Sequence, residues 1–188
     1  MAITATLCSP SESLLVVVDT QTKLAAAMPP IKRDEVLRNT AILLQAASLL
    51  GVPVLLTEQY PKGLGRTETA LTQHLPQGSP VIEKTCFSCC GATDFMAAVQ
   101  HSRRNQIILT GMEAHVCVLH TALDLHATGI QVFVVEDAVC SRRMRNKTNA
   151  LARLRQAGIV VTNTESVLFE WLRDASHEHF KAISALIH

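Results

Sequence analysis

The sequence has little excess charge, few aromatic residues and no long apolar run. Its 17 Lys and Arg residues are balanced by 16 Asp and Glu residues, and the net charge of +1 gives no electrostatic reason to expect a nucleic-acid or membrane partner. One Trp and one Tyr leave no aromatic motif on which bases could stack. The longest apolar runs have five residues, as at 14–18, whereas a membrane-spanning helix needs about 20. We therefore expect no membrane partner and no nucleic-acid partner.

The first residues also lack the marks of a targeting segment. MAITATLCSPSES has neither the cationic nor the apolar segment of a secretory signal, and it has no arginine of the kind that mitochondrial presequences carry. Six cysteines occur at irregular spacing, and a chain of 188 residues does not need disulfides to hold its core. We expect reduced thiols in an intracellular protein, cytoplasmic or mitochondrion-associated, that is not secreted.

Apolar residues make up 48% of the chain and charged residues 18%, which is enough for one well-buried core. We expect a single domain over residues 1–188, in which 1–12 form a polar leader. Apolar strands alternate with helical patterns, and this predicts an α/β fold: a three-layer, doubly wound sheet of six mainly parallel strands with helices on both faces. The predicted strands are 14–18, 52–57, 80–83, 106–110, 131–135 and 159–162; the predicted helices are 34–50, 67–74, 93–102, 117–128, 143–157 and a tail from 166, broken at 175–177.

Three chemically active residues follow the carboxyl ends of these strands. Asp19 ends the first strand, Lys84 ends the third, and Cys117 follows the fourth after a short turn. In parallel sheets these ends share one edge, where ligands bind, so we expect the three side chains to meet. Taken singly, Asp19 reads as a turn or helix-capping residue, Lys84 as a surface lysine and Cys117 as a buried structural cysteine. Together, a base, a cation and a nucleophile fit acyl-transfer chemistry.

The predicted position of Cys117 favours its ionised form. It falls among the first residues of a predicted helix, where the helix dipole and the unpaired N–H groups stabilise a thiolate. A carboxylate beside the thiol can take its proton, and an ammonium group beside both stabilises the resulting charges. We therefore predict that Cys117 is a thiolate nucleophile.

The segments VVVDTQ, IEKTCFS and GMEAHVCVLHTALDLHATGIQVFVVEDAV resemble the three signature segments of the isochorismatase-like cysteine hydrolases. The resemblance covers roughly residues 13–174, and TEQYPKGLGRT, GMEAHVC and ALARLRQAG place it closest to the isochorismatase-domain-containing branch. It implies a six-stranded parallel α/β fold and an Asp–Lys–Cys triad at Asp19, Lys84 and Cys117. It also implies a cis peptide bond at Met112–Glu113, with the backbone N–H groups of Glu113 and Cys117 directed at the oxyanion of the reaction.

The resemblance further implies that Cys117 attacks a carbonyl or related carbon and forms a covalent intermediate. Asp19 would relay the proton to the leaving group, and Lys84 would support the charge. We predict a metal-independent cysteine hydrolase that acts on a small amide-like (C–N) or related substrate, within a homo-oligomer. The loops around the same edge predict substrate contacts from Gln21, Tyr60, Phe87 and His115.

One region departs from part of the family. Nicotinamidases carry a metal-binding Asp-x-His after the second strand, where this chain has Glu58-Gln59-Tyr60. We therefore predict no catalytic metal and no cofactor, and a natural substrate other than nicotinamide.

Two further patterns leave alternatives open. Cys86, Cys89 and Cys90 lack the additional ligands that a zinc site needs, which leaves structural thiols or an oxidation-sensitive group. Residues 142–147 carry three Arg and one Lys, and we expect this basic run on a solvated or subunit-interface face. Some relatives carry a ribonuclease label, so the alternative function is a nucleic-acid-directed protein, or a non-catalytic binding or scaffold protein, of the same fold.

Overall fold

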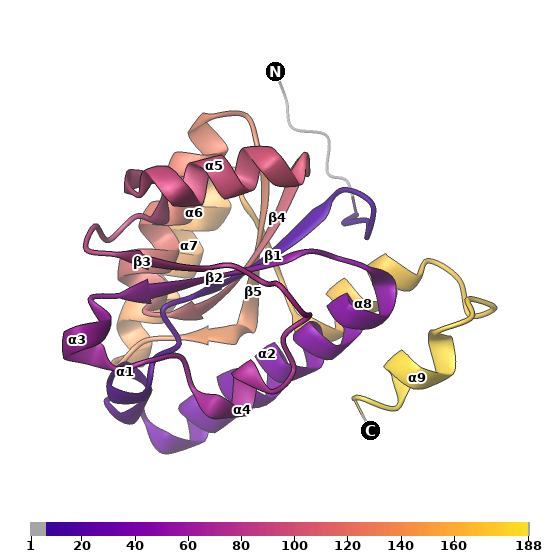
Figure 1. Ribbon diagram of the computed structural model, residues 1–188, viewed down its shortest axis with the longest axis horizontal. Coiled ribbons are helices and arrows are strands. Elements are labelled where there is room, and N and C mark those ends of the chain that lie inside the picture. The colour runs from indigo at the N-terminus through magenta and orange to yellow at the C-terminus, as the bar shows by residue number, and fades with distance from the viewer. Residues whose placement is uncertain (1–6, 188) are drawn as a thin grey trace.

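The computed structural model describes residues 7–187, and the named strands in this part of the chain form one parallel sheet. The strand order is β3-β2-β1-β4-β5-β6, so the chain begins in the middle of the sheet and winds outward in both directions (Figure 1). The strands are β1 (Ser13–Val18), β2 (Val54–Gln59), β3 (Val81–Lys84), β4 (Gln106–Met112), β5 (Gln131–Cys140) and β6 (Val160–Thr162). The predicted α/β fold with six parallel strands and helices on both faces is confirmed.

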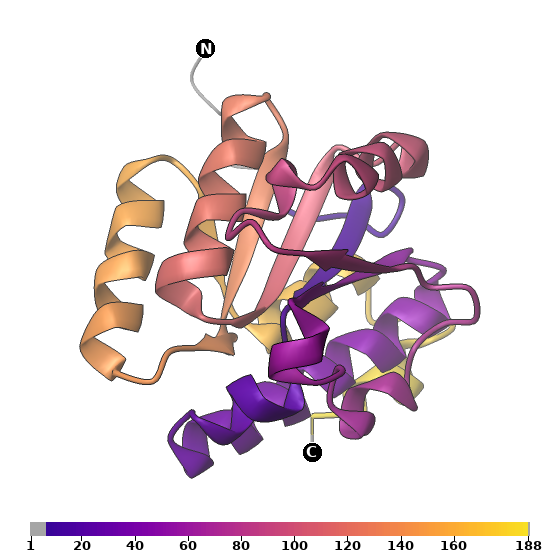
Figure 2. The same ribbon diagram turned by 60° about the vertical axis from the view of Figure 1, so that its left-hand side comes forward.

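The helices lie in two layers, one on each side of the sheet (Figures 1 and 2). Helices α5, α6 and α7 cover one face, and α2, α8 and α9 cover the other. The long helices are α2 (Pro30–Leu50), α5 (Thr93–Ser102), α6 (Leu119–Ala127), α7 (Met144–Gln156) and α8 (Thr164–Leu172). The short ones are α1 (Thr22–Ala26), α3 (Pro61–Leu64), α4 (Thr69–Thr72), the 3-10 turn η1 (Cys89–Gly91), the π-helical turn η2 (Ala114–Val118) and α9 (Phe180–Ser184).

The sequence of β1 explains why the sheet is buried on both faces. Leu14, Val16 and Val18 point into the core beneath α5, α6 and α7, whereas Leu15 and Val17 point into the core beneath α2 and α8. An unbroken apolar run of this kind suits a central parallel strand, because neither of its faces meets water. The polar residue that follows, Asp19, therefore stands at the carboxyl edge of the sheet rather than within a layer.

Gly111 allows β1 and β4 to approach closely beside this edge. It pairs with Val18, and a Cβ atom at Gly111 would overlap the carbonyl oxygen of Val18. Its φ of +119° is also a conformation that L side chains rarely adopt. As a result, the end of β1, which carries Asp19, lies directly beside the end of β4, which leads to Cys117.

Several elements differ in length from the prediction. Helix α2 begins at Pro30 rather than at residue 34, because a proline fits the first helical position, where no N–H bond is needed. Strands β4 and β5 extend to Met112 and Cys140 rather than to 110 and 135, after a shift in their pairing register between Leu109 and Gly111. The helix predicted from Cys117 is instead the π-helical turn η2 followed by α6 from Leu119.

Part of the predicted polar leader packs against the domain. Residues 1–6 lie outside the described residues, but Cys8 is buried and its backbone N–H donates to Glu170 Oε2 at 2.7 Å. Within residues 7–187, no helix has both the length and the apolar character needed to cross a membrane.

Candidate active site

Asp19 and Lys84 form a buried ion pair at the carboxyl edge of the sheet. Lys84 Nζ lies 2.6 Å from Asp19 Oδ2, and both side chains are fully shielded from solvent. Asp19 follows β1 with a φ of 49°, a left-handed conformation that is uncommon for a residue other than glycine. Since β2 lies between β1 and β3, the Lys84 side chain reaches across β2 to Asp19.

All three N–H groups of the Lys84 ammonium are engaged in hydrogen bonds. Besides Asp19, its Nζ donates to Gln59 Oε1 at 2.8 Å, to the Cys86 carbonyl at 3.1 Å and to the Phe87 carbonyl at 3.3 Å. Three N–H donors thus meet four acceptors. Burial by itself lowers the pKa of Lys84, but the charge and hydrogen bond of Asp19 together with the nearby Cys89 and Cys117 outweigh it and the pKa is raised. Lys84 is therefore a fixed positive charge.

The carboxylate of Asp19 is held from the β2 side. Thr57 Oγ1 donates to Asp19 Oδ1 at 2.7 Å, while Lys84 holds Oδ2. The backbone N–H of Asp19 donates to the Thr57 carbonyl at 3.1 Å. A buried ion pair loses the hydration of both charges, and hydrogen bonds from protein groups must offset that loss.

Cys117 completes the group of three. It lies in η2, is only 6% exposed, and its thiol is close enough to Asp19 and Lys84 for both charges to act on it. Burial raises the pKa of Cys117, the charge of Asp19 raises it further, and the opposing effect of Lys84 is smaller, so the pKa lies well above its ordinary value. This direction is opposite to the one predicted from a helix N-terminus, because Cys117 lies inside a buried turn. The resting group is a thiol.

The predicted cis peptide bond at Met112–Glu113 is present. The Glu113 carbonyl accepts hydrogen bonds from the N–H groups of Val116 and Val118, which anchors the start of η2. The Glu113 carboxylate turns toward Arg142, whose Nε donates to Oε1 at 2.8 Å and whose Nη2 donates to Oε2 at 3.3 Å. Burial pushes the pKa of Glu113 upward, but Arg142 outweighs it and the pKa is lowered. The Glu113 carboxylate therefore forms an ion pair with Arg142.

Two of the predicted substrate contacts have other partners. Gln21 is fully buried, and its amide binds only backbone: Nε2 donates to the carbonyls of Gln59 and Gly65, and Oε1 accepts from Gln59 N–H. It joins the end of β1 to β2 and to the loop after β2, and a substrate contact at Gln21 stays a prediction. His115 is half-buried, with Nδ1 3.0 Å from Ser141 Oγ and Nε2 3.2 Å from Asn146 Nδ2. Both ring nitrogens have partners within the protein, and a substrate contact at His115 stays a prediction.

The other two predicted contacts, Tyr60 and Phe87, are exposed. Their side chains are 55% and 58% exposed, large fractions for aromatic residues. The ring of Phe87 meets that of His120 edge-on, with 6.3 Å between their centroids. Tyr60 and Phe87 each follow a strand that carries part of the ion pair or its hydrogen bonds, so they remain available to a ligand near it.

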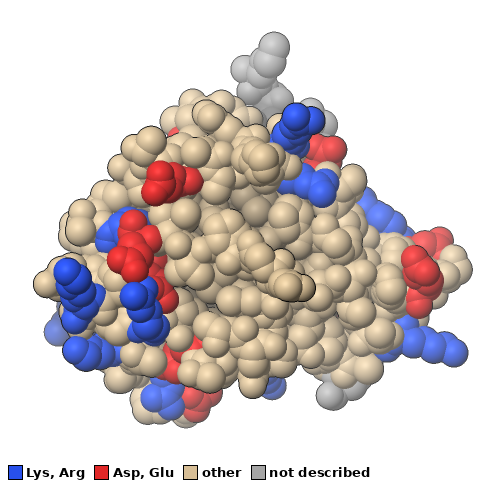
Figure 3. Space-filling model, viewed as in Figure 1, with Lys and Arg blue, Asp and Glu red and all other residues tan. Residues whose placement is uncertain are grey.

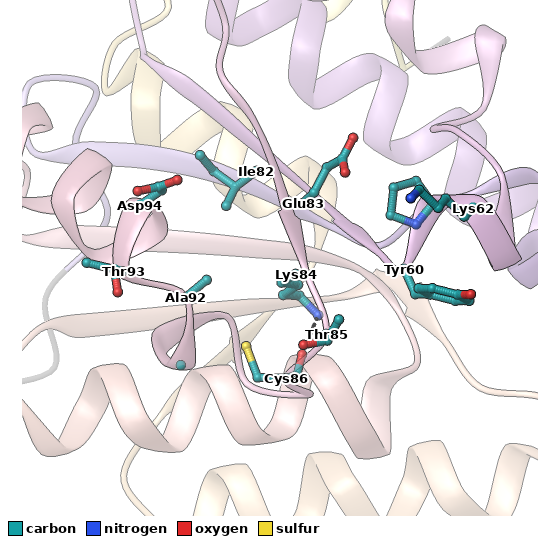
Figure 4. Close-up of a pocket in the computed structure, with 12 residues that line it drawn as sticks. Tyr60, Lys62, Ile82, Glu83, Lys84, Thr85, Cys86, Ala92, Thr93 and Asp94 are labelled. Carbon is teal, nitrogen blue, oxygen red and sulfur yellow. Dashed lines mark hydrogen bonds between the residues drawn. The ribbon is translucent and has the colours of Figure 1, made fainter.

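A cavity of about 580 Å³ lies beside β3, at the free edge of the sheet (Figure 4). Its walls include Tyr60, Lys84, Cys86 and residues at the start of α5. Of Asp19, Lys84 and Cys117, only Lys84 contributes to these walls. In Figure 4 the amine of Lys84 points toward the segment that carries Thr85 and Cys86. The cavity thus adjoins Lys84, and neither Asp19 nor Cys117 forms part of its walls.

The sequence did not single out Thr57 and Gln59 as site residues. Their side chains lie on the same face of β2, where Thr57 binds Asp19 and Gln59 binds Lys84. The available signal was their polarity within VLLTEQ, a strand that is otherwise apolar at its start. Two residues apart on a strand, such side chains share one face and can serve neighbouring groups.

The residues present do not fit a metal site like that of the nicotinamidases. Glu58 uses its carboxylate to accept from Thr67 N and Oγ1 and from Arg66, each at 2.8 Å. Within the described part of the chain, no three His, Cys, Asp or Glu side chains are grouped in a way that could hold a metal ion.

The parallel sheet and the buried Asp–Lys pair beside a thiol define an α/β protein of the kind expected from the sequence. Residues 13–166 match the isochorismatase domain family, and the chain belongs to that family. It is 40% identical, over 178 residues, to isochorismatase domain-containing protein 2A of Mus musculus, covering 95% of this chain and 84% of that one.

Two solved structures are similar over nearly the whole chain. One is described as MAR1 ribonuclease from Caenorhabditis elegans, with a TM-score of 0.91 and 36% identity over 97% of this chain and 92% of that one. The other is the YcaC gene product of Escherichia coli, described as an octameric hydrolase of unknown specificity, with a TM-score of 0.90 and 25% identity over 98% and 91% of the two chains. Membership of the family makes a hydrolytic role plausible and leaves the substrate open.

Proposed function

We propose that this protein is a metal-independent cysteine hydrolase that cleaves an amide-like C–N bond in a small molecule. The observation that carries the proposal is the buried Cys117 thiol, close enough to a fully buried Asp19–Lys84 pair for both charges to act on it. Burying two charges is costly, and the pair stands at the sheet edge where parallel α/β proteins bind ligands. In this proposal Asp19 is the base, Cys117 the nucleophile and Lys84 a fixed charge.

The first half of the reaction transfers the acyl group to sulfur. As Cys117 Sγ bonds to the substrate carbonyl carbon, its proton passes to Asp19 and the carbonyl oxygen becomes an oxyanion. Asp19 then gives the proton to the leaving nitrogen as the C–N bond breaks, which leaves a thioester. Because the pKa of Cys117 is raised, proton transfer accompanies the attack and does not precede it.

The second half consumes water. A water molecule attacks the thioester carbon while Asp19 accepts one of its protons, and collapse of the intermediate releases the acid and returns the proton to Cys117 Sγ. Lys84 stays protonated throughout, since all of its N–H groups are bound. Stabilisation of the oxyanion is assigned to the backbone N–H groups of Glu113 and Cys117, each worth about 3 kcal/mol in comparable sites.

The test is the loss of turnover in Cys117→Ala, assayed on a panel of small amides on which the wild type is active. Wild-type labelling by iodoacetamide, in which sulfur displaces iodide, should occur at Cys117, and mass spectrometry of the Cys117 peptide should report its loss in the variant. Asp19→Asn should slow both reactions by at least about 100-fold, the usual contribution of a general base.

Cys90→Ala serves as the matched control, because Cys90 is a partly exposed thiol that lies outside the cavity walls. It should leave turnover unchanged. Full turnover in Cys117→Ala would discard the mechanism, even if the family assignment stands.

Assembly into a homo-oligomer is part of the same proposal. The E. coli YcaC neighbour is described as octameric, and this chain leaves large apolar side chains such as Ile31 and Phe87 exposed. Aromatic residues such as Phe are enriched in subunit contacts relative to the rest of the surface.

A further inference from the structure

Thr57 is the hydrogen-bond donor on the side of Asp19 opposite to Lys84. Its Oγ1 lies 2.7 Å from Asp19 Oδ1, fully within the protein, and Val18 is its direct neighbour on β1. The strand pairing therefore fixes the hydroxyl at the point where β1 ends and Asp19 turns away. Each carboxylate oxygen thus has its own protein donor.

Two other groups determine the direction in which the Thr57 hydroxyl points. The Asp19 N–H donates to Oγ1 at 3.3 Å, and the Cys89 thiol donates to it at 3.7 Å. Burial raises the pKa of Cys89 to about 12, so this thiol keeps its proton near neutral pH and remains a donor. With two donors already facing Oγ1, the hydroxyl proton is directed to Asp19.

We propose that Thr57, oriented by Cys89, is a positioning residue that holds the Asp19 carboxylate aligned to accept the Cys117 proton. This inference rests on the proposed function. A hydrogen bond donated to a carboxylate stabilises its charged form, so replacing the O–H group of Thr57 should favour protonation of this carboxylate. It also assigns a role to Cys89, which the reaction does not otherwise use.

Other charged or titratable groups face Asp19 from three elements. They are Lys84 at the end of β3, Cys89 in η1 and Cys117 in η2. Lys84 stays charged and Cys89 stays neutral across the range where carboxylates titrate, because the pKa of each is raised. A shift in the acid limb of a reactivity profile on changing Thr57 therefore reports on Asp19.

The experiment measures the rate of iodoacetamide labelling at Cys117 as a function of pH in the full chain, by mass spectrometry. It compares wild type with Thr57→Val, which replaces the hydroxyl by a methyl of similar size, and with Thr57→Ser, which restores the hydroxyl. In Thr57→Val the acid limb should move upward by about one pH unit, since losing a hydrogen bond to a charged group is worth about one pKa unit or more. Thr57→Ser should return it to near the wild-type position.

Cys89→Ala provides a second arm, should Thr57→Val unfold. It removes the S–H donor and leaves Thr57 in place, and it should move the limb in the same direction by a smaller amount. A purely structural role would lower the labelling rate equally at every pH. If the acid limb of the labelling profile stays at its wild-type position in these variants, the inference is overturned. Failure of the proposed function looks different: wild-type Cys117 would then label no faster than Cys86, or Asp19→Asn would leave the rate unchanged.

Discussion

At the scale of single residues, the buried ion pair of Asp19 and Lys84 should have a measurable effect on the stability of the protein. Both side chains are fully buried, with 2.6 Å between Nζ and Oδ2. A buried ion pair contributes little net stability compared with apolar residues of the same volume. Removing one partner, however, leaves the other charge buried without a counter-charge, which is strongly destabilising. The two partners should therefore depend on each other strongly.

Lys84→Met should lower the free energy of unfolding by about 3–5 kcal/mol, because the Asp19 carboxylate loses its counter-charge in a buried position. Adding Asp19→Asn should recover much of that loss, since the amide is neutral and its carbonyl can still accept from Thr57. Urea denaturation of wild type, both single variants and the double variant measures the coupling. Strictly additive losses would mean that the two charges act independently, contrary to the geometry.

Residue types and their positions after strands were enough to predict that Asp19, Lys84 and Cys117 would be neighbours, because carboxyl ends of parallel strands share an edge. The protonation state of Cys117 was not predictable in this way. It depends on the burial of the thiol and on the nearby Asp19 carboxylate, and both follow from the three-dimensional structure. The backbone contacts of Gln21 were not predictable either, because a polar residue after a strand can bind the backbone as readily as a ligand.

At the scale of elements, β2 is the strand that organises the site. Thr57 and Gln59 point to one face and hold the ion pair, while Glu58 points to the other face. There Glu58 binds Thr67 and Arg66 and so ties the segment after α3 back to the sheet. Gln21 binds the same loop at Gly65. The loop that carries Tyr60 is thus fastened at both ends.

Glu58→Gln should weaken this attachment in a pH-dependent way. Burial raises the pKa of Glu58, but hydrogen bonds from Thr67 and Arg66 outweigh it and the pKa is lowered in the folded protein. The stabilisation is therefore present above the unfolded-state pKa of about 4.3 and is lost as pH falls through the folded-state value. At pH 7 the variant should lose about 1–3 kcal/mol of unfolding free energy.

Denaturation at several pH values checks this expectation. The difference between wild type and Glu58→Gln should shrink as pH falls from about 5 to about 3. Glu83→Gln is the matched control, because Glu83 binds the same Arg66 but its side chain is 56% exposed. Its removal should cost little, as for other exposed pairs. A difference that stays constant with pH would show that the Glu58 charge is not what holds the loop.

At the scale of the whole molecule, the alternation of apolar and helical patterns was sufficient to predict the sheet, its parallel strands and the two helical layers. The ends of elements were less predictable. Strand β5 continues through Glu136 and Asp137, polar residues that indicated a strand end, because the pairing of β4 with β5 resumes beyond Leu109. Tertiary pairing of this kind outweighs local preference.

The distribution of charge bears on the alternative, nucleic-acid-directed function. Lys and Arg side chains lie beside Asp and Glu at the margins of the face in Figure 3, and the middle of that face carries few charges. In the basic run, Arg142 is bound to Glu113, and Lys147 is half-buried with a pKa that burial lowers. Arg143 and Arg145 are its remaining exposed members. Two arginines make few phosphate contacts.

Single-stranded RNA should therefore bind weakly and with little dependence on salt. Each phosphate contact releases counterions, so the logarithm of the association constant falls with the logarithm of salt concentration by about 0.7 per contact on a single strand. Fluorescence anisotropy of a labelled oligonucleotide between about 50 and 200 mM salt measures this slope, which should not exceed that of about two contacts. Arg143→Glu combined with Arg145→Glu should remove what slope there is. A slope several times steeper in the wild type, abolished by this double change, would instead establish the basic run as a nucleic-acid surface and favour the alternative function.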